Sequence, residues 1–245
     1  MQLDEEFPES LEELEKEIEE LEKTEIVPPE EVPKKKVKRE VPTERKFRFS
    51  SVFVGFLILF AYFFALTYVA IDKLITELHI TEITQSEHFV ISAIFPLTAI
   101  PSIPNVMLLI VTDQLSLIIT SIDSATASVE LTLLVGWLLV FVYSLVISSD
   151  IYILLFVVGI MPYLLAGFAA GALNKDPGYG FVAGLFIWIL SLIIAVVLMN
   201  IMITQLFGEL LSITDILIGY ISTGYLSAIF LVIFGVLGGA MRGQE

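Results

Sequence analysis

The chain has 245 residues, of which 56% are hydrophobic, and its formal net charge at pH 7 is −15. Residues 1–48 hold 10 of the 13 basic and 16 of the 28 acidic side chains. This composition excludes an ordinary soluble domain, and the few basic residues beyond position 48 argue against nucleic-acid binding. The absence of cysteine excludes disulfides, thiolate metal sites and a cysteine nucleophile.

Residues 1–48 are expected to form a cytoplasmic, partly disordered arm. Its first part, residues 10–24, is predicted to be a short acidic amphipathic helix that begins at the capping box Ser10-Leu11-Glu12-Glu13. One face of this helix carries apolar side chains at 3-4-3 spacing: Leu11, Leu14, Ile18 and Leu21. Either this seam docks another protein or a second copy, or the helix is partly formed in a solvated tail.

Residues 28–48 form a proline-rich basic linker that leads to the membrane edge. Its basic side chains are Lys34, Lys35, Lys36, Lys38, Arg39, Arg45, Lys46 and Arg48. They could contact anionic lipid head groups at ~1 kcal/mol each. The alternative is that they only mark the cytoplasmic side of the first span, which is the usual role of such clusters. Either interpretation places the N-terminus inside the cell.

Residues 49–245 are predicted to form an all-α, polytopic domain in the cell membrane. An apolar run of about 20 residues crosses the hydrocarbon layer as a helix, and uninterrupted runs suit helices rather than barrel strands. The expected spans are residues 51–71, 89–111, 131–148, 151–173, 181–203 and 216–241.

Residues 72–88 contain both histidines of the chain among several carboxylates. His79 and Glu82 would share a helix face, and Glu87 precedes His88, so a metal site can be drawn. Histidines in a polar loop more often face water, and we therefore expect no metal and no cofactor.

The run 89–111 is the ambiguous one. Pro96, Pro101 and Pro104 interrupt it, and proline removes an amide donor and disfavours helix at the preceding residue. The run is therefore either a broken span or a re-entrant element. Because discontinuous helices can present backbone groups to a cargo, these prolines and Asn105 form a candidate transport segment.

Two late basic residues favour six spans over five. The positive-inside rule places Lys175 and Arg242 in the cytoplasm. The span that ends before Lys175 must then run inward, so an even number of crossings separates it from the first span. Counting residues 131–148 and 89–111 as those two gives six spans with both termini inside. Five spans remain the alternative, since two lone cations carry the argument.

Glycine pairs at a spacing of four lie near the ends of the last three spans. They are Gly167 and Gly171, Gly180 and Gly184, and Gly235 and Gly239. Each pair lies on one helix face, where helix backbones can approach closely, and six spans put all three pairs at one depth. We therefore expect a packing contact there.

The residues around these glycines resemble a known kind of protein. The run from Pro162 to Gly184 is similar to the glycine-rich hairpin of small archaeal multi-pass membrane proteins of unknown function, and the closing Gly-Val-Leu-Gly-Gly-Ala-Met-Arg is similar to their ends. The resemblance covers about the last 90 residues. It implies an archaeal source and assigns no activity.

Catalytic motifs are missing from the sequence, and no ionisable residue lies in the middle of a clean span. We therefore expect no enzyme. The first hypothesis is a non-enzymatic membrane component or scaffold that contacts partners through residues 10–24. The alternative is a small transporter or channel that uses the proline-broken segment 96–104.

Overall fold

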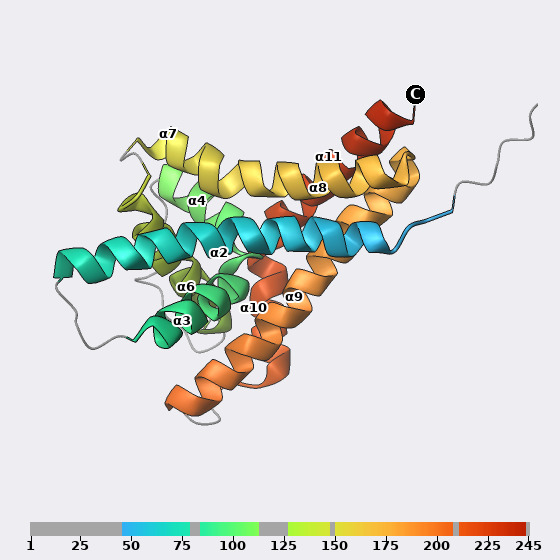
Figure 1. The fold of residues 1–245 in the computed structure, drawn as a ribbon. Coiled ribbons are helices and arrows are strands. Elements are labelled where there is room, and N and C mark those ends of the chain that lie inside the picture. Colours follow the sequence, from blue (N-terminus) through green and yellow to red (C-terminus); the bar gives the residue numbers. More distant parts are fainter. Residues whose placement is uncertain (1–45, 79–83, 113–126, 148–149, 208–210, 244–245) are drawn as a thin grey trace, which may run out of the picture. The chain divides into compact units, whose positions relative to one another are not determined.

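The computed structural model describes residues 46–78, 84–112, 127–147, 150–207 and 211–243, all of which belong to the unit Glu44–Glu245. These described ranges are helical, without a strand (Figure 1). The prediction of an all-α membrane fold is confirmed. The predicted arm helix 10–24, the linker up to Arg45, and the pair His79 and Glu82 lie outside the described residues.

The helices keep the order of the predicted spans but differ from them in their limits. They are α2 (Ser50–Leu78), α3 (Gln85–Ala99), α4 (Ile103–Val111), α6 (Ala127–Ser144), α7 (Ile151–Leu154), the π-helix η1 (Leu155–Ile160), α8 (Met161–Asn174), α9 (Pro177–Phe207), α10 (Ile213–Thr223) and α11 (Tyr225–Arg242).

In the described part of the chain, four helices are long and apolar enough to cross a membrane: Ser50–Glu77, Ile151–Asn174, Pro177–Gln205 and Tyr225–Arg242. The count rises to five if α3 and α4, which meet at a bend of 73°, are taken as one span. The chain is therefore a multi-pass membrane protein. Six spans are more than length and composition support, because Ser128–Ser144 is a shorter apolar helix.

The predicted last span, residues 216–241, is wrong as a single helix. The chain breaks at Gly224, which separates α10 from α11. Only α11 is long enough to be a candidate span, and Ile213–Thr223 is again a shorter apolar helix. A hydropathy pattern does not reveal this break, because both sides of Gly224 are apolar.

Local signals explain where several helices begin. Thr84 and Glu87 form a reciprocal capping box at the start of α3, and Ser212 and Asp215 form another at α10. The turn between α8 and α9 ends α8 with Lys175 in the left-handed region at φ 55°. The side chain of Asp176 then accepts the Tyr179 N–H at 3.0 Å and caps α9.

Proline accounts for the irregular part of the span that contains η1. In this π-helix the amide of residue i donates to the carbonyl of residue i−5, as Met161 does to Phe156. The next residue, Pro162, has no N–H to give to the carbonyl of Val157. The hydroxyl of Tyr62 in α2 donates to that carbonyl instead, at 2.8 Å.

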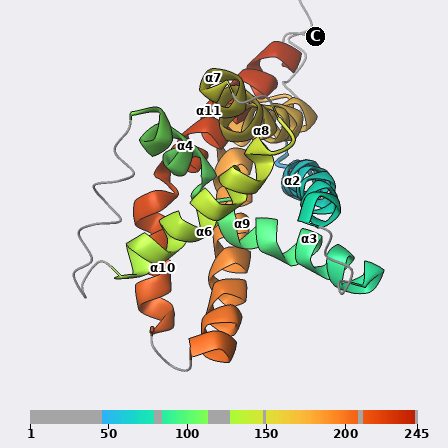
Figure 2. The same ribbon diagram turned by 90° about the vertical axis from the view of Figure 1, so that its left-hand side faces the viewer.

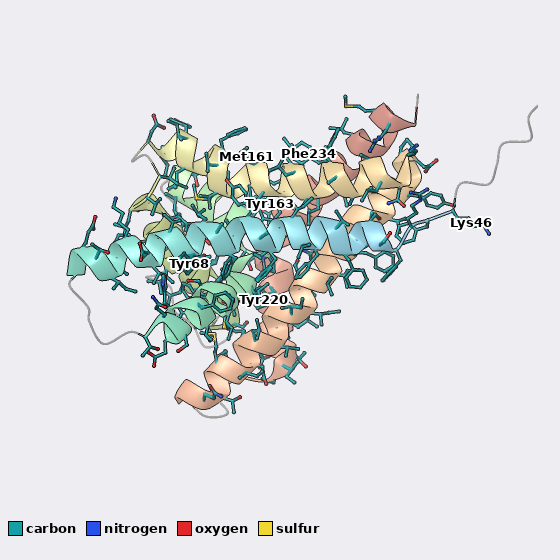
Figure 3. The ribbon with its side chains drawn as sticks, viewed as in Figure 1. Lys46, Tyr68, Met161, Tyr163, Tyr220 and Phe234 are labelled. Atoms are coloured by element: carbon teal, nitrogen blue, oxygen red, sulfur yellow. The ribbon has the colours of Figure 1, made fainter. Side chains whose placement is uncertain are left out.

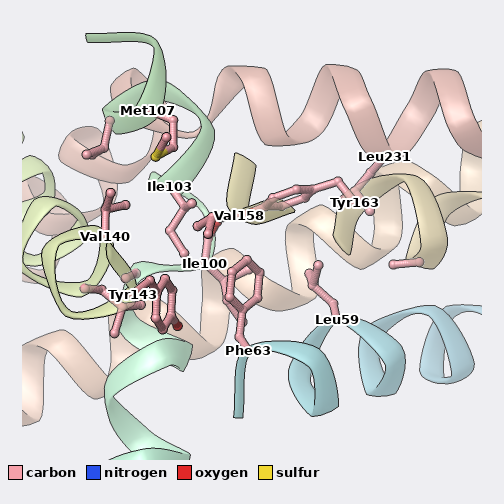
Figure 4. Close-up of a cluster of buried hydrophobic side chains, with 14 of the residues drawn as sticks. Leu59, Phe63, Ile100, Ile103, Met107, Val140, Tyr143, Val158, Tyr163 and Leu231 are labelled. Atoms are coloured by element: carbon pink, nitrogen blue, oxygen red, sulfur yellow. Dashed lines mark hydrogen bonds between the residues drawn. The ribbon is translucent and has the colours of Figure 1, made fainter. Parts of the chain in front are cut away.

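Contacts between distant residues define the packing of the long helices. Helix α2 runs antiparallel to the segment α7–α8, since Tyr62 meets Val157 and Asn174 meets Arg48; the two lie side by side in Figure 1. Between them the buried rings of Phe63 and Tyr163 pack edge to face with centroids 6.0 Å apart (Figure 4).

Candidate functional site

Two broken helices meet inside the described unit. The chain between α3 and α4 breaks at residues 100–102, and the chain between α10 and α11 breaks at Gly224. The hydroxyl of Ser227 donates to the carbonyl of Pro101 at 2.9 Å, and the amide of Leu226 donates to the side-chain oxygen of Asn105 at 3.3 Å. We call residues 98–105 and 220–227 the crossing; the α3–α4 bend is visible in Figure 2.

The prolines of the first break leave backbone carbonyls without helical donors. Pro104 has no N–H for the carbonyl of Ile100, and the hydroxyl of Tyr163 donates to it instead. The amide of Ser102 turns to Ala99, which leaves the carbonyl of Thr98 to the hydroxyl of Tyr220. Figure 3 labels both tyrosines. Side chains from α8 and α10 thus replace the missing amides.

Side chains also reach the second break, although the carbonyl of Gly224 keeps a backbone donor, the amide of Ala228 at 3.3 Å. The indole N–H of Trp188 in α9 donates to the carbonyl of Gly224 at 3.0 Å, and the hydroxyl of Ser227 lies 2.6 Å from the same oxygen. A Cβ at Gly224 would lie 3.3 Å from the indole nitrogen and 3.4 Å from the carbonyl oxygen of Pro101. The lack of a side chain therefore lets Trp188 and the first break come close to this position.

Helix α6 joins the crossing through hydroxyl groups. The hydroxyl of Ser102 lies 3.3 Å from the carbonyl of Thr132, and the hydroxyls of Thr132 and Thr223 are 3.3 Å apart. A Cβ at Gly219 would come within 2.6 Å of the carbonyl oxygen of Ser128. The short helices α6 and α10 therefore contact each other closely beside the breaks.

The crossing carries no formal charge, and it is buried except at the exposed Ile221, Ser222 and Tyr225 and the half-buried Leu226. Asn105 is 8% exposed and Ser102 is fully buried, and residues 98–105 and 220–227 contain no Asp, Glu, Lys, Arg or His. Within the described ranges, no three potential metal-ligating residues gather. Hydroxyls, an amide, an indole and backbone carbonyls can bind a neutral hydrogen-bonding molecule, whereas they offer no acid or base for catalysis at neutral pH.

The structure assigns different positions to the four residues of the predicted transport segment. Pro101 and Asn105 contact α11 in the crossing, and Pro104 lies in the first turn of α4. Pro96 lies within α3, one turn away. Sequence reasoning missed the groups that meet them, namely Tyr163, Trp188, Tyr220, Gly224 and Ser227. Only Gly224, between Thr223 and Tyr225 in an apolar run, could have been singled out as a helix breaker.

The six glycines singled out in the sequence lie where α8, α9 and α11 approach one another. A Cβ at Gly167 would lie 2.7 Å from the carbonyl oxygen of Leu231, and one at Gly171 would lie 2.8 Å from the carbonyl carbon of Gly235. From α9, a Cβ at Gly180 would lie 2.7 Å from that same carbon. The remaining three make similar approaches: Gly184 to Leu231, Gly235 to Gly180, and Gly239 to Asp176.

One end of the described unit gathers several cationic residues. The side chain of Asn174 accepts the Arg48 amide at 2.9 Å and donates to the Ser51 hydroxyl at 2.6 Å, so α2 begins beside the α8–α9 turn that contains Lys175. Helix α11 ends there as well, because Gly239 lies against Asp176. Lys46 and Arg48, the part of the predicted basic cluster that is described, are exposed.

Comparison of the chain with protein-family models, with curated proteins and with solved structures finds no match. The resemblance of the last 90 or so residues to archaeal membrane proteins stays a prediction.

Proposed function

We propose that this multi-pass membrane protein is a small passive transporter or channel, and that its cargo is a neutral solute that forms hydrogen bonds. The crossing carries the proposal. Two discontinuous helices meet there, and discontinuous helices present unwound backbone groups at transport sites. The carbonyls of Thr98, Ile100 and Pro101 accept hydrogen bonds from hydroxyl groups of other helices, so a cargo with both donors and acceptors could exchange with these partners one at a time.

The neutral lining sets the class of cargo. Thr98, Pro101 and Gly224 offer carbonyl oxygens, and Tyr220 and Ser227 offer hydroxyls. A charged cargo in a lipid environment needs an opposite charge or full coordination, and an ion-coupled pump needs an ionisable group, which the crossing lacks. The proposal is therefore downhill movement without an enzymatic step. The scaffold hypothesis depends on residues 10–24, which lie outside the described residues, and stays a prediction.

We further propose that four segments span the membrane, namely α2, α7–α8, α9 and α11, and that α3 and α4 form a re-entrant pair. Both helices of this pair contact the half of the unit in which α2 ends and α7 begins, next to Asp150. His88 of α3 lies beside Tyr68 of α2, and a Cβ at Gly159 in η1 would lie 3.4 Å from Met107 of α4. Four membrane spans, like six, return the end of α11 to the side on which α2 begins.

The charge distribution supports a cytoplasmic position for that side. Among the five described cations, all except Lys73 belong to the end where α2 begins, α8 meets α9 and α11 terminates: Lys46, Arg48, Lys175 and Arg242. Positive charge beside spanning helices favours the cytoplasm. This orientation agrees with the one expected from the basic linker.

The experiment is permeation into proteoliposomes that contain the full-length protein. Swelling is followed by stopped-flow light scattering in glycerol and in urea, and potassium entry is followed with an internal dye. We expect glycerol or urea to enter faster than into protein-free liposomes, while potassium entry stays at background. Ser227→Ala removes the hydroxyl at Pro101 and should change the rate several-fold.

Ser144→Ala is the matched control, because among the described residues that hydroxyl bonds only within its own helix, to Phe141, outside the crossing. Its permeation rate should equal that of the wild type. Neutral-solute permeation at the protein-free level, or equal rates for Ser227→Ala and wild type, would contradict the proposal. Potassium entry above background would refute the neutral cargo.

A further inference from the structure

The buried face of α3 leads from one surface of the unit to the crossing. His88, Ser92, Pro96 and Ala99 are all buried on this helix, and their spacing of four, four and three residues places them on one helix face. The far end of this face is Ala99, beside the break. The near end is His88, whose ring stacks on Tyr68 at a centroid distance of 4.3 Å.

Ser92 has an unsatisfied group on this face. Its side-chain oxygen is fully buried and has no hydrogen-bond partner among the described residues. Other buried hydroxyls in the spans donate back to their own helix, as Thr67 does to Phe63 at 2.7 Å. A buried polar atom without a partner is rare in native structures, and an ordered water is a common explanation.

The backbone carbonyl of the same residue lacks its regular helical donor. In a regular helix the carbonyl of Ser92 accepts the amide of residue 96, but Pro96 has no N–H. Ser92 therefore combines a free hydroxyl donor with a carbonyl that lost its helical donor. One residue thus offers both a donor and an acceptor to a small guest, nearly two helical turns from the crossing.

We infer that Ser92 binds a water-sized neutral molecule, and that this site, between His88 and the crossing, is the step by which a neutral solute reaches the crossing. This inference rests on the proposed function and identifies the side from which the crossing is filled. Water occupies this site at rest, because the hydroxyl and the carbonyl of Ser92 offer it a donor and an acceptor.

The natural absence of cysteine permits a direct test. Ser92→Cys is reconstituted in the full-length protein and exposed to a small, membrane-impermeant methanethiosulfonate reagent, which reacts with the thiolate and therefore requires water. Two controls lie in other environments. Ala195→Cys is equally buried, at 0% exposed, in the apolar cluster of α9, and Ile91→Cys is 42% exposed on the same helix as Ser92.

We expect Ser92→Cys to react at least about tenfold faster than Ala195→Cys, because only a hydrated site supports the thiolate, while Ile91→Cys gives the rate at an exposed position of the same helix. A rate for Ser92→Cys no greater than that of Ala195→Cys would overturn the inference. Fast reaction of Ser92→Cys, found together with solute permeation at the protein-free level, would support the water site. It would refute only the proposed transport function.

Ser92→Ala provides a second measurement that does not depend on labelling or transport. If the hydroxyl is a true orphan, its removal relieves a buried polar group and raises the thermal midpoint in detergent. If a water is bound, its removal costs the bound water a hydrogen bond, and the midpoint stays equal or falls. A clear rise would therefore overturn the inference, even where Ser92→Cys does not fold.

Discussion

Gly171→Ala is the sharpest test of the contact between α8 and α11. The added methyl carbon would lie 2.8 Å from the carbonyl carbon of Gly235, 2.9 Å from the amide nitrogen of Gly239 and nearer still to the Gly235 carbonyl oxygen. Ordinary contact begins at 3.4 Å. All three atoms belong to the backbone, so a side-chain rotation cannot relieve the overlap, and α11 must move by about 1.5 Å to restore ordinary contact with the Gly235 oxygen.

Two effects of opposite sign decide the size of the change. Replacing glycine by alanine inside a helix favours the helix by about 1 kcal/mol. Overpacking a tight contact costs about 1–3 kcal/mol, and backbone overlap belongs at the upper end of that range. We therefore expect a net loss of about 1–2 kcal/mol, which lowers the thermal midpoint by about 2–8 °C for a unit of this size.

The assay is thermal unfolding of the purified protein in detergent, followed by size-exclusion of the surviving fraction. Gly178→Ala is the matched control, since it makes the same change in the same hairpin but meets only the side-chain oxygen of Asp176, at 3.1 Å. Its midpoint should equal or slightly exceed that of the wild type. If Gly171→Ala melts together with Gly178→Ala, the glycines do not hold these helices together.

Three further predictions concern other contacts. Asn174→Ala should destabilise the protein by about 1–3 kcal/mol, because the buried side chain that accepts the Arg48 amide is lost; an unchanged melting curve would show that α2 is not anchored there. Tyr163→Phe should cost a similar ~1–3 kcal/mol by removing the donor to the carbonyl at the α3–α4 break, and equal stability of the two proteins would mean that another donor serves that carbonyl. In intact cells, an impermeant thiol reagent should label Asp150→Cys directly and Lys175→Cys only after permeabilisation, whereas labelling of both from one side would exclude a crossing by α7–α8.

The proposed four spans keep the predicted relation between the two ends of the described chain but change the number of spans from the predicted six. The sequence argument counted residues 89–111 and 131–148 as two crossings, which keeps the start of the chain, Lys175 and Arg242 on one side. The contacts bring Arg48, Asn174 and Gly239 to one end. Four membrane spans meet the same requirement, because the argument asks only for an even number of spans.

Local chemistry accounts for what could be read from the sequence by itself. An uninterrupted apolar run of about 20 residues predicts a membrane helix, because lipid offers no partner to a bare backbone. The hairpin turn at Asn174–Gly178 and the interruption at Pro101 follow in the same way from residues that cannot continue a helix. The sequence therefore predicted the long helices, their order along the chain and one of the two helix breaks.

Only the tertiary structure decided which surfaces meet. A membrane helix is apolar on its lipid side and on its protein side alike, so the sequence pattern does not reveal the buried face. The donors that complete the crossing, from Tyr163, Trp188 and Tyr220, lie 36 to 122 residues from the carbonyls that they serve. A backbone group freed by proline or glycine must find a partner somewhere in the fold, and only the packing of the helices determines which side chain that is.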